Sequence, residues 1–281
     1  MRITDIRELS VQLQGNVANA LVNFSEHTIS LVAVVTDAVR HGKPVIGLAF
    51  DSIGRYAQGG ILRERIIPRV MAAARSAPGS LLDPSGAAFD VSKLLQLMLK
   101  NEKPGGHGDR AAAIGALELA FWDINAKLAD EPAWRTVARH FGTIAKTDGV
   151  HVYAAGGYYY PDDSTQRLRD EFRAYQDRGF DAFKMKIGGA PLAQDMARIE
   201  AALDVATKGS RLAVDANGRF DLETALAYAK AMEPLDLRWY EEIGDPLDYD
   251  LNRRVVEAYS GTVATGENLF SVPDVNNLLL F

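Results

Sequence analysis

The amino-acid sequence predicts an α/β protein, in which a (β/α) barrel resembling the TIM barrel follows an α+β domain. From about residue 150 onward, β-like and helix-like segments alternate strictly, and a new strand begins roughly every 25–30 residues. Strands that alternate with helices pair in parallel, and units of this length are typical of a barrel. A separate pattern of three strands near the N-terminus, followed by helices, predicts the α+β domain.

The N-terminal part reads as a meander of strands followed by helices. β-branched residues dominate the predicted strands, and the turn-forming run His-Gly-Lys-Pro separates the last two. The strands are expected at 3–13, 28–39 and 44–50, and the helices near 61–74, 91–100 and 109–129. The Gly/Pro-rich stretch NEKPGGHGD joins the last two helices. Together these elements predict an α+β domain over residues 1–145.

The alternating units occupy residues 146–281, the predicted barrel domain. Its strands are expected at 151–157, 180–188, 211–217, 237–242 and 262–267, and its helices at 164–178, 191–207, 222–233 and 247–259. A doubly wound open sheet is the alternative, and it usually has a Gly-rich phosphate loop after its first strand. The run Ala155-Gly156-Gly157 is not such a loop, which favours the barrel.

The predicted barrel is incomplete at its C-terminal end. About five strands precede Phe281, whereas an eight-stranded barrel needs roughly 100 further residues at this repeat length. An open barrel would leave an unpaired strand edge. We therefore expect the chain to be part of a longer protein, with an intact mass above 30.6 kDa.

Composition narrows the class of protein. The net charge is −6 and no basic run occurs, so the sequence favours neither nucleic-acid nor membrane-surface binding. No apolar run approaches the ~20 residues of a membrane span, and the first residues have a strand pattern rather than that of a signal peptide. The absence of cysteine excludes disulfides, thiolate metal sites and a cysteine nucleophile, and it is consistent with a cytoplasmic protein.

Acidic residues follow three successive predicted barrel strands at equal steps. Asp215, Glu241 and Glu267 each lie 26 residues from the next, and Lys184 and Lys186 precede them by about one repeat. Equal steps place residues at one height on neighbouring parallel strands, at the rim where the active sites of such barrels lie. Carboxylates without His or Cys nearby suit Mg²⁺, because it is a hard cation. The sequence therefore predicts a magnesium site at this rim.

The lysine pair predicts a base beside the metal. Lys184 and Lys186 alternate with apolar residues, so both ammonium groups face the barrel interior while the apolar side chains pack outward against helices. Two ammonium groups beside a dication repel one another, which lowers a lysine pKa. A metal and a lysine base suit the removal of a proton from the carbon next to a carboxylate. Asn217, two residues after Asp215, is a candidate to bind the substrate or a metal ligand.

Each of these residues alone has a plainer explanation. A single carboxylate after a strand is most often a solvated loop residue or a charge at a helix N-terminus, and two lysines can form a solvated strand face. The equal steps and the lysine pair together favour a functional site. Glu242, beside Glu241, is expected to point to the opposite face of the strand and to have a structural role.

Four motifs in this chain resemble the mandelate racemase branch of the enolase superfamily: Lys-x-Lys at 184–186, Asp-x-Asn at 215–217, WYEE and TGEN. The resemblance covers essentially the whole chain, since AFWDINAKLADEPAW is similar to the helix before the barrel and the N-terminal domain to the capping domain. It implies Mg²⁺ held by Asp215, Glu241 and Glu267. It also implies Lys186 as the proton-abstracting base, Lys184 as the residue that holds the substrate carboxylate, and a homo-oligomer.

Several stretches are most similar to D-tartrate dehydratases, among them NEKPGGHGDR, VYAAGGYYYP, FKMKIGGAP and ATGENLF. By this resemblance the substrate is a hydroxy-dicarboxylate or another acid sugar, and the reaction is loss of water to a 2-keto acid, which is oxaloacetate from D-tartrate. Asn19, Lys103 and Tyr160 become candidate substrate contacts, together with Asn217.

Two departures accompany this resemblance, and three alternatives stay open. The partner acid, a histidine in this branch, is expected beyond Phe281, and Asp51 and Ile53 stand where the tartrate enzymes have asparagines. A racemase or epimerase would use the same enolate, as would a dehydratase of another acid sugar. A non-catalytic protein that binds dicarboxylates, or keeps the metal as a structural element, would need no base.

Overall fold

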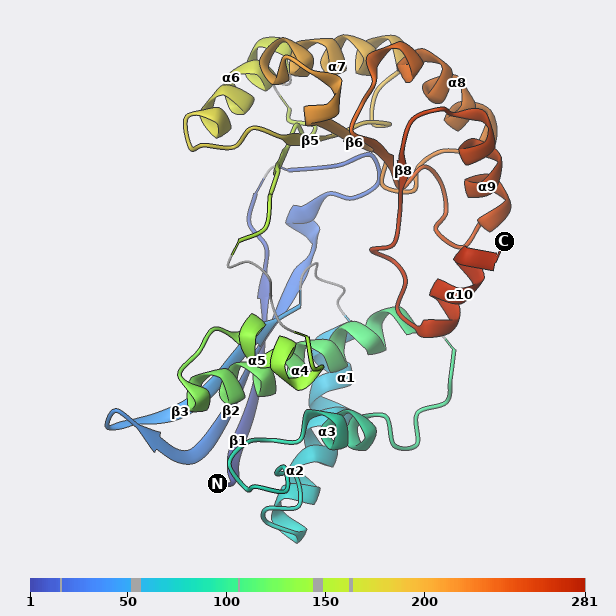
Figure 1. The fold of residues 1–281 in the computed structure, drawn as a ribbon. Coiled ribbons are helices and arrows are strands. Elements are labelled where there is room, and N and C mark those ends of the chain that lie inside the picture. The colour runs from blue at the N-terminus through green and yellow to red at the C-terminus, as the bar shows by residue number, and fades with distance from the viewer. Residues whose placement is uncertain (16, 52–56, 106, 144–148, 162–163, 281) are drawn as a thin grey trace. The chain divides into compact units, whose positions relative to one another are not determined.

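The computed structural model describes residues 1–15, 17–51, 57–105, 107–143, 149–161 and 164–280. The chain divides into two compact units (Figure 1). Met1–Leu13 and Glu26–Gly149 form the first unit, and Gln14–Ser25 and Val150–Phe281 form the second. The first unit is built on a three-stranded sheet and the second on a five-stranded sheet.

The first unit has an antiparallel sheet in the order β1-β2-β3, and helix α4 packs on β2 and β3. Its strands are β1 (Ile3–Gln12), β2 (Thr28–Arg40) and β3 (Lys43–Phe50). Its helices are α1 (Ala57–Ile61), the π-helical turn Leu62–Ile66, α2 (Ile67–Ser76), α3 (Val91–Met98), α4 (His107–Ala129) and α5 (Ala133–His140). The predicted strands are confirmed to within a residue or so at each end, whereas α5 has no counterpart among the predicted elements.

One segment lies in a different unit from the predicted domain. Gln14–Ser25 belongs to the second unit, although the sequence pattern assigned it to the domain at 1–145. The peptide N–H of Tyr159 donates to the carbonyl of Ala18 at 2.9 Å, and the rings of Phe24 and Tyr158 meet edge to face. Such pairing joins residues far apart in the chain, so local patterns do not reveal it.

The second unit has a parallel sheet in the order β4-β5-β6-β7-β8. Its strands are β4 (Ala154–Gly156), β5 (Phe183–Lys186), β6 (Leu212–Asp215), β7 (Trp239–Glu241) and β8 (Val263–Ala264). Its helices are α6 (Thr165–Gln176), α7 (Leu192–Ala206), α8 (Leu222–Met232), α9 (Tyr249–Ala258) and α10 (Val272–Leu280). Helices α6 to α9 lie along one side of the sheet (Figure 1). The alternating architecture predicted for a modified (β/α) barrel is thereby confirmed.

Capping side chains determine where several helices of the second unit begin. Ser164 accepts a hydrogen bond from the peptide N–H of Arg167 at the start of α6. Asp221 caps α8 in the same way, and Asp248 caps α9. Each cap satisfies a peptide N–H that has no partner inside the helix, so it stabilises the helix start and sets the length of the preceding loop.

Apolar side chains of the parallel strands pack outward against the helices. Phe183 and Met185 of β5 are fully buried, and Phe183 stacks on Phe172 of α6 with 4.9 Å between ring centroids. The prediction that apolar residues of β5 pack against helices is confirmed. Because side chains alternate along a strand, Lys184 and Lys186 face the other way, toward the interior.

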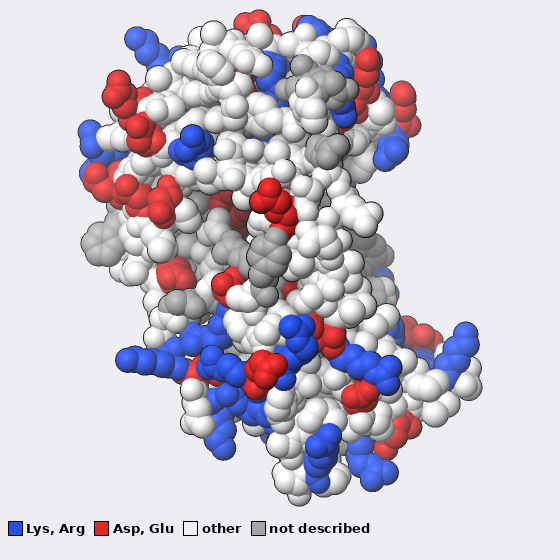
Figure 2. All heavy atoms as spheres, turned by 180° about the vertical axis from the view of Figure 1, so that it is seen from behind, with Lys and Arg blue, Asp and Glu red and all other residues white. Residues whose placement is uncertain are grey.

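Two further features concern the surface and the helices. No helix in the described part of the chain is long and apolar enough to cross a membrane. On the face shown in Figure 2, Lys and Arg side chains are interspersed with Asp and Glu side chains.

Candidate active site

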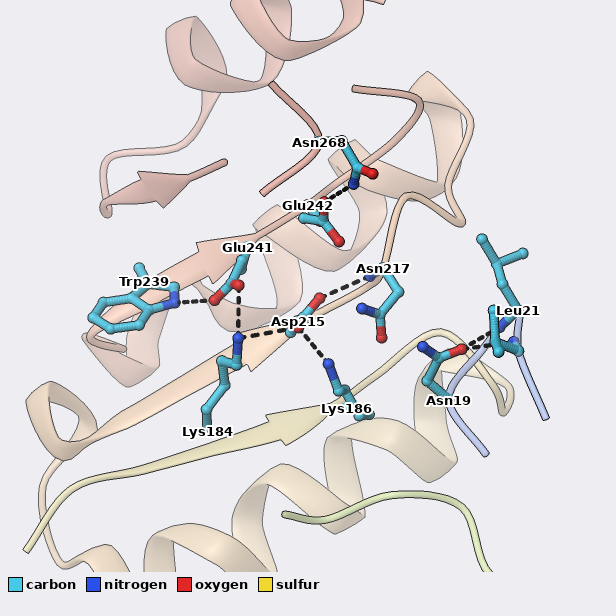
Figure 3. A network of polar contacts seen from close by, with 11 residues as sticks. Asn19, Leu21, Lys184, Lys186, Asp215, Asn217, Trp239, Glu241, Glu242 and Asn268 are labelled. Carbon is cyan, nitrogen blue, oxygen red and sulfur yellow. Dashed lines mark hydrogen bonds and ion pairs between the residues drawn. The ribbon is translucent and has the colours of Figure 1, made fainter. Parts of the chain in front are cut away.

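Strand register brings a lysine and two carboxylates to the same edge of the parallel sheet. Lys186 pairs with Asp215 across β5 and β6, and Asp215 pairs with Glu241 across β6 and β7. Each of the three is the last residue of its strand. The prediction that a step of 26 residues places Asp215 and Glu241 at one height is confirmed, and Figure 3 shows the side chains of Lys186, Asp215 and Glu241 converging.

The converging side chains form a buried network of ion pairs. Nζ of Lys186 donates to Oδ2 of Asp215 at 2.6 Å, and Nζ of Lys184 donates to Oε1 of Glu241 at 2.6 Å. Nζ of Lys184 also lies 3.3 Å from Oδ2 of Asp215. Asp215 is fully buried, and both lysines are buried as well. Charges removed from water are costly unless they are paired, so each buried charge in this network is stabilised by the opposite charges beside it.

The carboxylates change the expected electrostatics of Lys184. Burial by itself lowers the pKa of this lysine, but its hydrogen bond to Glu241 and the negative charges of Asp215 and Glu241 outweigh burial, and the net effect raises the pKa. The carboxylates that contact Lys184 therefore act on its pKa in the opposite direction to the predicted repulsion between the two lysines. Both carboxylates contact the ammonium group directly, at 2.6 Å for Glu241 and 3.3 Å for Asp215.

Glu267 departs from the regular register. Glu241 pairs with Ala264 of β8, and Glu267 lies three residues further on, exposed, in the turn that follows β8. Glu267 therefore does not lie at the same height as Asp215 and Glu241, although it follows Glu241 at the same step of 26 residues. The strand is short, and the chain leaves it through Gly266, which has a φ of 136° that favours glycine.

Glu242 joins the same cluster, contrary to the expectation that it points away from Glu241. Its φ of 46° is in the left-handed region, so the chain leaves the extended conformation and the alternation of side chains ends. The side chain is buried, and Nδ2 of Asn268 donates to its Oε1 at 2.6 Å. Burial, followed by the negative charges of Glu267 and Asp215, raises the pKa of Glu242 to about 7.

This raised pKa predicts a specific pH dependence of stability in the presence of a chelator. The folded protein binds the Glu242 proton more tightly than the unfolded chain, whose carboxyl has a pKa near 4.5, so stability falls as pH rises from about 4.5 to about 7. Urea unfolding should show that Glu242→Gln gains up to about 3 kcal/mol relative to the wild type across this window. Parallel pH profiles of the two proteins would contradict the assignment.

Aromatic residues that the sequence analysis did not single out surround the charged network. Nε1 of Trp239 donates to Oε2 of Glu241 at 2.7 Å. Nζ of Lys184 lies 5.5 Å from the ring centroid of Tyr153, and Nζ of Lys186 lies 5.5 Å from that of Tyr158. The signal for Trp239 was present, because residues two apart on a strand share a face. Tyr153 and Tyr158 flank a strand of only three residues, and local alternation gives no such signal for them.

Two predicted substrate contacts, Asn217 and Asn19, lie near this network (Figure 3). The peptide N–H of Asn217 donates to Oδ1 of Asp215 at 2.9 Å. Oδ1 of Asn19 accepts from the peptide N–H groups of Leu21 and Val22, so this oxygen closes a tight turn of its own loop. The loop is held close to the strand ends, since a Cβ built on Gly188 would lie 3.5 Å from that of Ala20.

The other two predicted contacts, Tyr160 and Lys103, have different surroundings. The hydroxyl of Tyr160 donates to Glu171 of α6 at 3.3 Å, and burial followed by the Glu171 charge raises the pKa of Tyr160 to about 12. Lys103 is exposed in the first unit, where its carbonyl accepts a hydrogen bond from Arg110. Ile53 lies outside the described residues. The substrate roles of these residues stay predictions.

The donor chemistry of the cluster fits a hard cation. Among the described residues, no group of three or more His, Cys, Asp or Glu side chains is already arranged to hold a metal ion. Carboxylates are nevertheless concentrated here, because Asp215 and Glu241 end neighbouring paired strands. The charges of Glu267 and Asp215 accordingly raise the pKa of Glu242. Oδ1 of Asn217 is buried and has no hydrogen-bond partner within the described structure. Oxygen donors of this kind are the ligands that Mg²⁺ prefers.

Comparison with known proteins identifies the family. Residues 167–280 match the family described as enolase C-terminal domain-like. The 3,6-anhydro-alpha-L-galactonate cycloisomerase of Streptomyces coelicolor is 34% identical over 192 residues, which are 68% of this chain and 51% of that enzyme. The arabinonate dehydratase of Saccharolobus solfataricus is 32% identical over 168 residues, which are 59% of this chain and 43% of that enzyme.

A solved structure with the same fold extends the match to nearly the whole chain. The crystal structure of L-talarate/galactarate dehydratase from Salmonella typhimurium, liganded with Mg and L-lyxarohydroxamate, superposes with a TM-score of 0.74 and 24% sequence identity. The superposition covers 98% of this chain and 66% of that chain. The family match places residues 167–280 in the enolase superfamily, among the proteins related to mandelate racemase and muconate lactonizing enzyme, and the solved structure shows that nearly the whole chain has the same fold. The chain spans about half the length of the curated relatives that it matches.

Proposed function

We propose that this chain carries the active site of a Mg²⁺-dependent lyase, which removes the proton α to the carboxylate of an acid sugar and eliminates water. The observation that carries the proposal is the contact between Lys186 and Asp215 beside Glu241, at the ends of three neighbouring strands. The names of two relatives, dehydratases of arabinonate and of L-talarate/galactarate, support the reaction class.

In this proposal Asp215, Glu241 and Glu267 hold Mg²⁺, and Glu242 lies next to them. When bound, the ion would offset the charge of these carboxylates and stabilise the negative charge that develops on the substrate carboxylate. Lys186 takes the α-proton at Nζ. Lys184 binds the substrate carboxylate, and since an ammonium group has three N–H donors, it can do so while keeping its contacts to Asp215 and Glu241.

Within this class we propose D-tartrate as the substrate and oxaloacetate as the product. The support is the similarity of several stretches around the site, such as FKMKIGGAP and ATGENLF, to D-tartrate dehydratases. The names of the two compared dehydratases refer to arabinonate, talarate and galactarate, so these acid sugars belong in any substrate panel. A cytoplasmic location and a homo-oligomer remain predictions that go with this function.

Proton NMR of the full-length protein with Mg²⁺ in deuterium oxide tests both reaction and substrate. Oxaloacetate formed from D-tartrate alone would support the whole proposal. Dehydration of a different acid sugar would keep the reaction and change the substrate. A panel without dehydration or exchange of the α-proton would refute the lyase assignment.

A cycloisomerase or racemase is the second candidate, favoured by the relative named as a cycloisomerase. Both reactions would begin with the same proton abstraction by Lys186, and neither loses water. Exchange of the α-proton for deuterium, with the β-hydroxyl retained, would move the assignment to this class.

Removal of the indole N–H of Trp239 is expected to weaken metal binding. The Trp239 N–H donates to Oε2 of Glu241 and so orients a proposed Mg²⁺ ligand. Such supporting hydrogen bonds are typically worth about 10–100-fold in metal affinity. Trp239→Phe keeps a ring and removes the donor, and its Mg²⁺ affinity is measured by calorimetry. Trp134→Phe, on α5 of the first unit, is the control and should bind Mg²⁺ like the wild type.

A further inference from the structure

Helix α7 carries two charged side chains whose burial the proposed chemistry does not explain. Asp195 and Arg198 are 0% and 2% exposed, and their ion pair has 3.2 Å between Oδ1 and Nη1. A buried ion pair gives little net stability, because both charges lose their hydration. Its hydrogen bonds to the rest of the unit therefore indicate what the pair does.

The guanidinium group of Arg198 binds main-chain carbonyls at the ends of β4 and β5. Nη1 donates to the carbonyl of Lys186 at 2.9 Å. Nη2 donates to the carbonyls of Gly157 at 2.8 Å and Tyr158 at 3.1 Å. The Gly157 carbonyl also accepts from the peptide N–H of Lys186 at 3.2 Å. Because guanidinium is a rigid planar fork of donors, Arg198 holds these carbonyls in one arrangement.

Asp195 anchors the chain on the other side of Lys186. Its Oδ2 accepts from the peptide N–H of Gly188 at 2.7 Å and from the hydroxyl of Tyr228 at 2.8 Å. Its Oδ1 accepts from the hydroxyl of Tyr159 at 2.7 Å. The pair therefore binds the main chain at Lys186 and at Gly188. Through the hydroxyl of Tyr228 it also connects this stretch to helix α8.

We infer that the Asp195–Arg198 pair positions Lys186 for proton abstraction. The inference rests on the proposed function, in which Lys186 is the base. Arg198 also holds the carbonyl of Tyr158, whose ring lies 5.5 Å from Nζ of Lys186. Both members of the pair act through the main chain, so they are positioning residues, and their loss misdirects the lysine.

Arg198→Lys in the full-length protein tests the inference, because a lysine keeps the charge but its single nitrogen cannot reproduce the planar fork, in which two nitrogens contact the three carbonyls. A displacement of a catalytic group by about 1 Å can cost about 10²-fold in rate, so kcat should fall by about 10²-fold while KM changes less than about threefold. A second measurement does not need turnover. The ratio of the acetylation rates of Lys186 and Lys184 by acetic anhydride, quantified by peptide mass spectrometry, should differ from the wild-type ratio, because the surroundings of Lys186 change.

Two matched controls on α7 separate positioning from stability. Val205→Ala removes buried methyl groups of the core and lowers the melting temperature without touching the pair. Asp204→Asn removes a surface ion pair with Arg169 on α6. Both controls should keep the wild-type kcat and the wild-type acetylation ratio.

The outcomes are distinct. A change of kcat and acetylation ratio in Arg198→Lys, absent from both controls, supports positioning. An Arg198→Lys protein that is only less stable, or a Val205→Ala protein with the same changes, overturns it. If Arg198→Lys does not fold, Tyr228→Phe removes one partner of Asp195 and should also change the ratio from its wild-type value. If the wild type itself shows no turnover, the proposed function fails, and the acetylation ratio still decides whether the pair positions Lys186.

Discussion

Lys186→Ala is expected to lower turnover by about 10²–10⁴-fold, the usual contribution of a positioned general base. Nζ of Lys186 lies 2.6 Å from Oδ2 of Asp215 in a buried site, and alanine has no group that can accept the proton. Proton NMR in deuterium oxide measures both dehydration and exchange of the α-proton. Both rates should fall together, because both begin with the same abstraction.

The control for this variant is Lys208→Ala, an exposed lysine just after α7, which should keep full activity. Unchanged turnover of Lys186→Ala would refute the assignment of the base. If the protein only binds dicarboxylates, the wild type will show no turnover either. Its Lys186→Ala variant would then keep the ligand affinity of the wild type. Calorimetry with the substrate panel separates these cases.

Asp215→Asn is expected to cause the largest loss of stability in the second unit. Asp215 is fully buried and contacts Nζ of Lys184 and of Lys186, so its neutralisation leaves buried ammonium groups without their shared carboxylate. Breaking a buried pair by removing one partner costs about 3–5 kcal/mol. Urea unfolding in a chelator measures this loss, and calorimetry should show that Mg²⁺ binding is lost as well.

Asp221→Asn is the matched control, because Asp221 is an exposed helix cap and asparagine caps helices as well as aspartate does. Its stability should change by less than about 0.5 kcal/mol. A second test is the double variant Asp215→Asn with Lys186→Met, which removes both partners. If the loss comes from the unpaired charge, the double variant should be more stable than Asp215→Asn alone. Additive losses would contradict this explanation.

The alternation of strands and helices could be predicted from local sequence because each element depends mainly on its own residues. The helices predicted at 164–178 and 222–233 correspond to α6 (Thr165–Gln176) and α8 (Leu222–Met232), and the structure adds that Ser164 and Asp221 cap them. The ladder of Lys186, Asp215 and Glu241 could be predicted for the same reason. Each of these residues is separated from the next by about one strand–helix repeat, which keeps them in register, and the three are paired across β5, β6 and β7.

The places where the predictions fail are those where the chain leaves regular geometry. Glu242 has a φ of 46°, so strand alternation no longer describes its side chain, and Glu267 follows a strand of only two residues. The segment that carries Asn19 lies in the second unit through a main-chain contact between Ala18 and Tyr159. None of these depends on a local pattern, because each results from backbone torsions or from contacts between distant residues.

The sequence by itself determined the fold class, the superfamily, and the chemistry of a carboxylate cluster beside a lysine pair. Only the tertiary structure decided which hydrogen bonds and ion pairs these groups form. It placed Trp239 on Glu241, raised the pKa of Lys184 through contact with carboxylates, and put Arg198 on the carbonyl of Lys186. The physical reason is range. Strand and helix patterns reflect neighbours within a few residues, whereas the energies of buried charges depend on partners that only folding brings within about 3 Å.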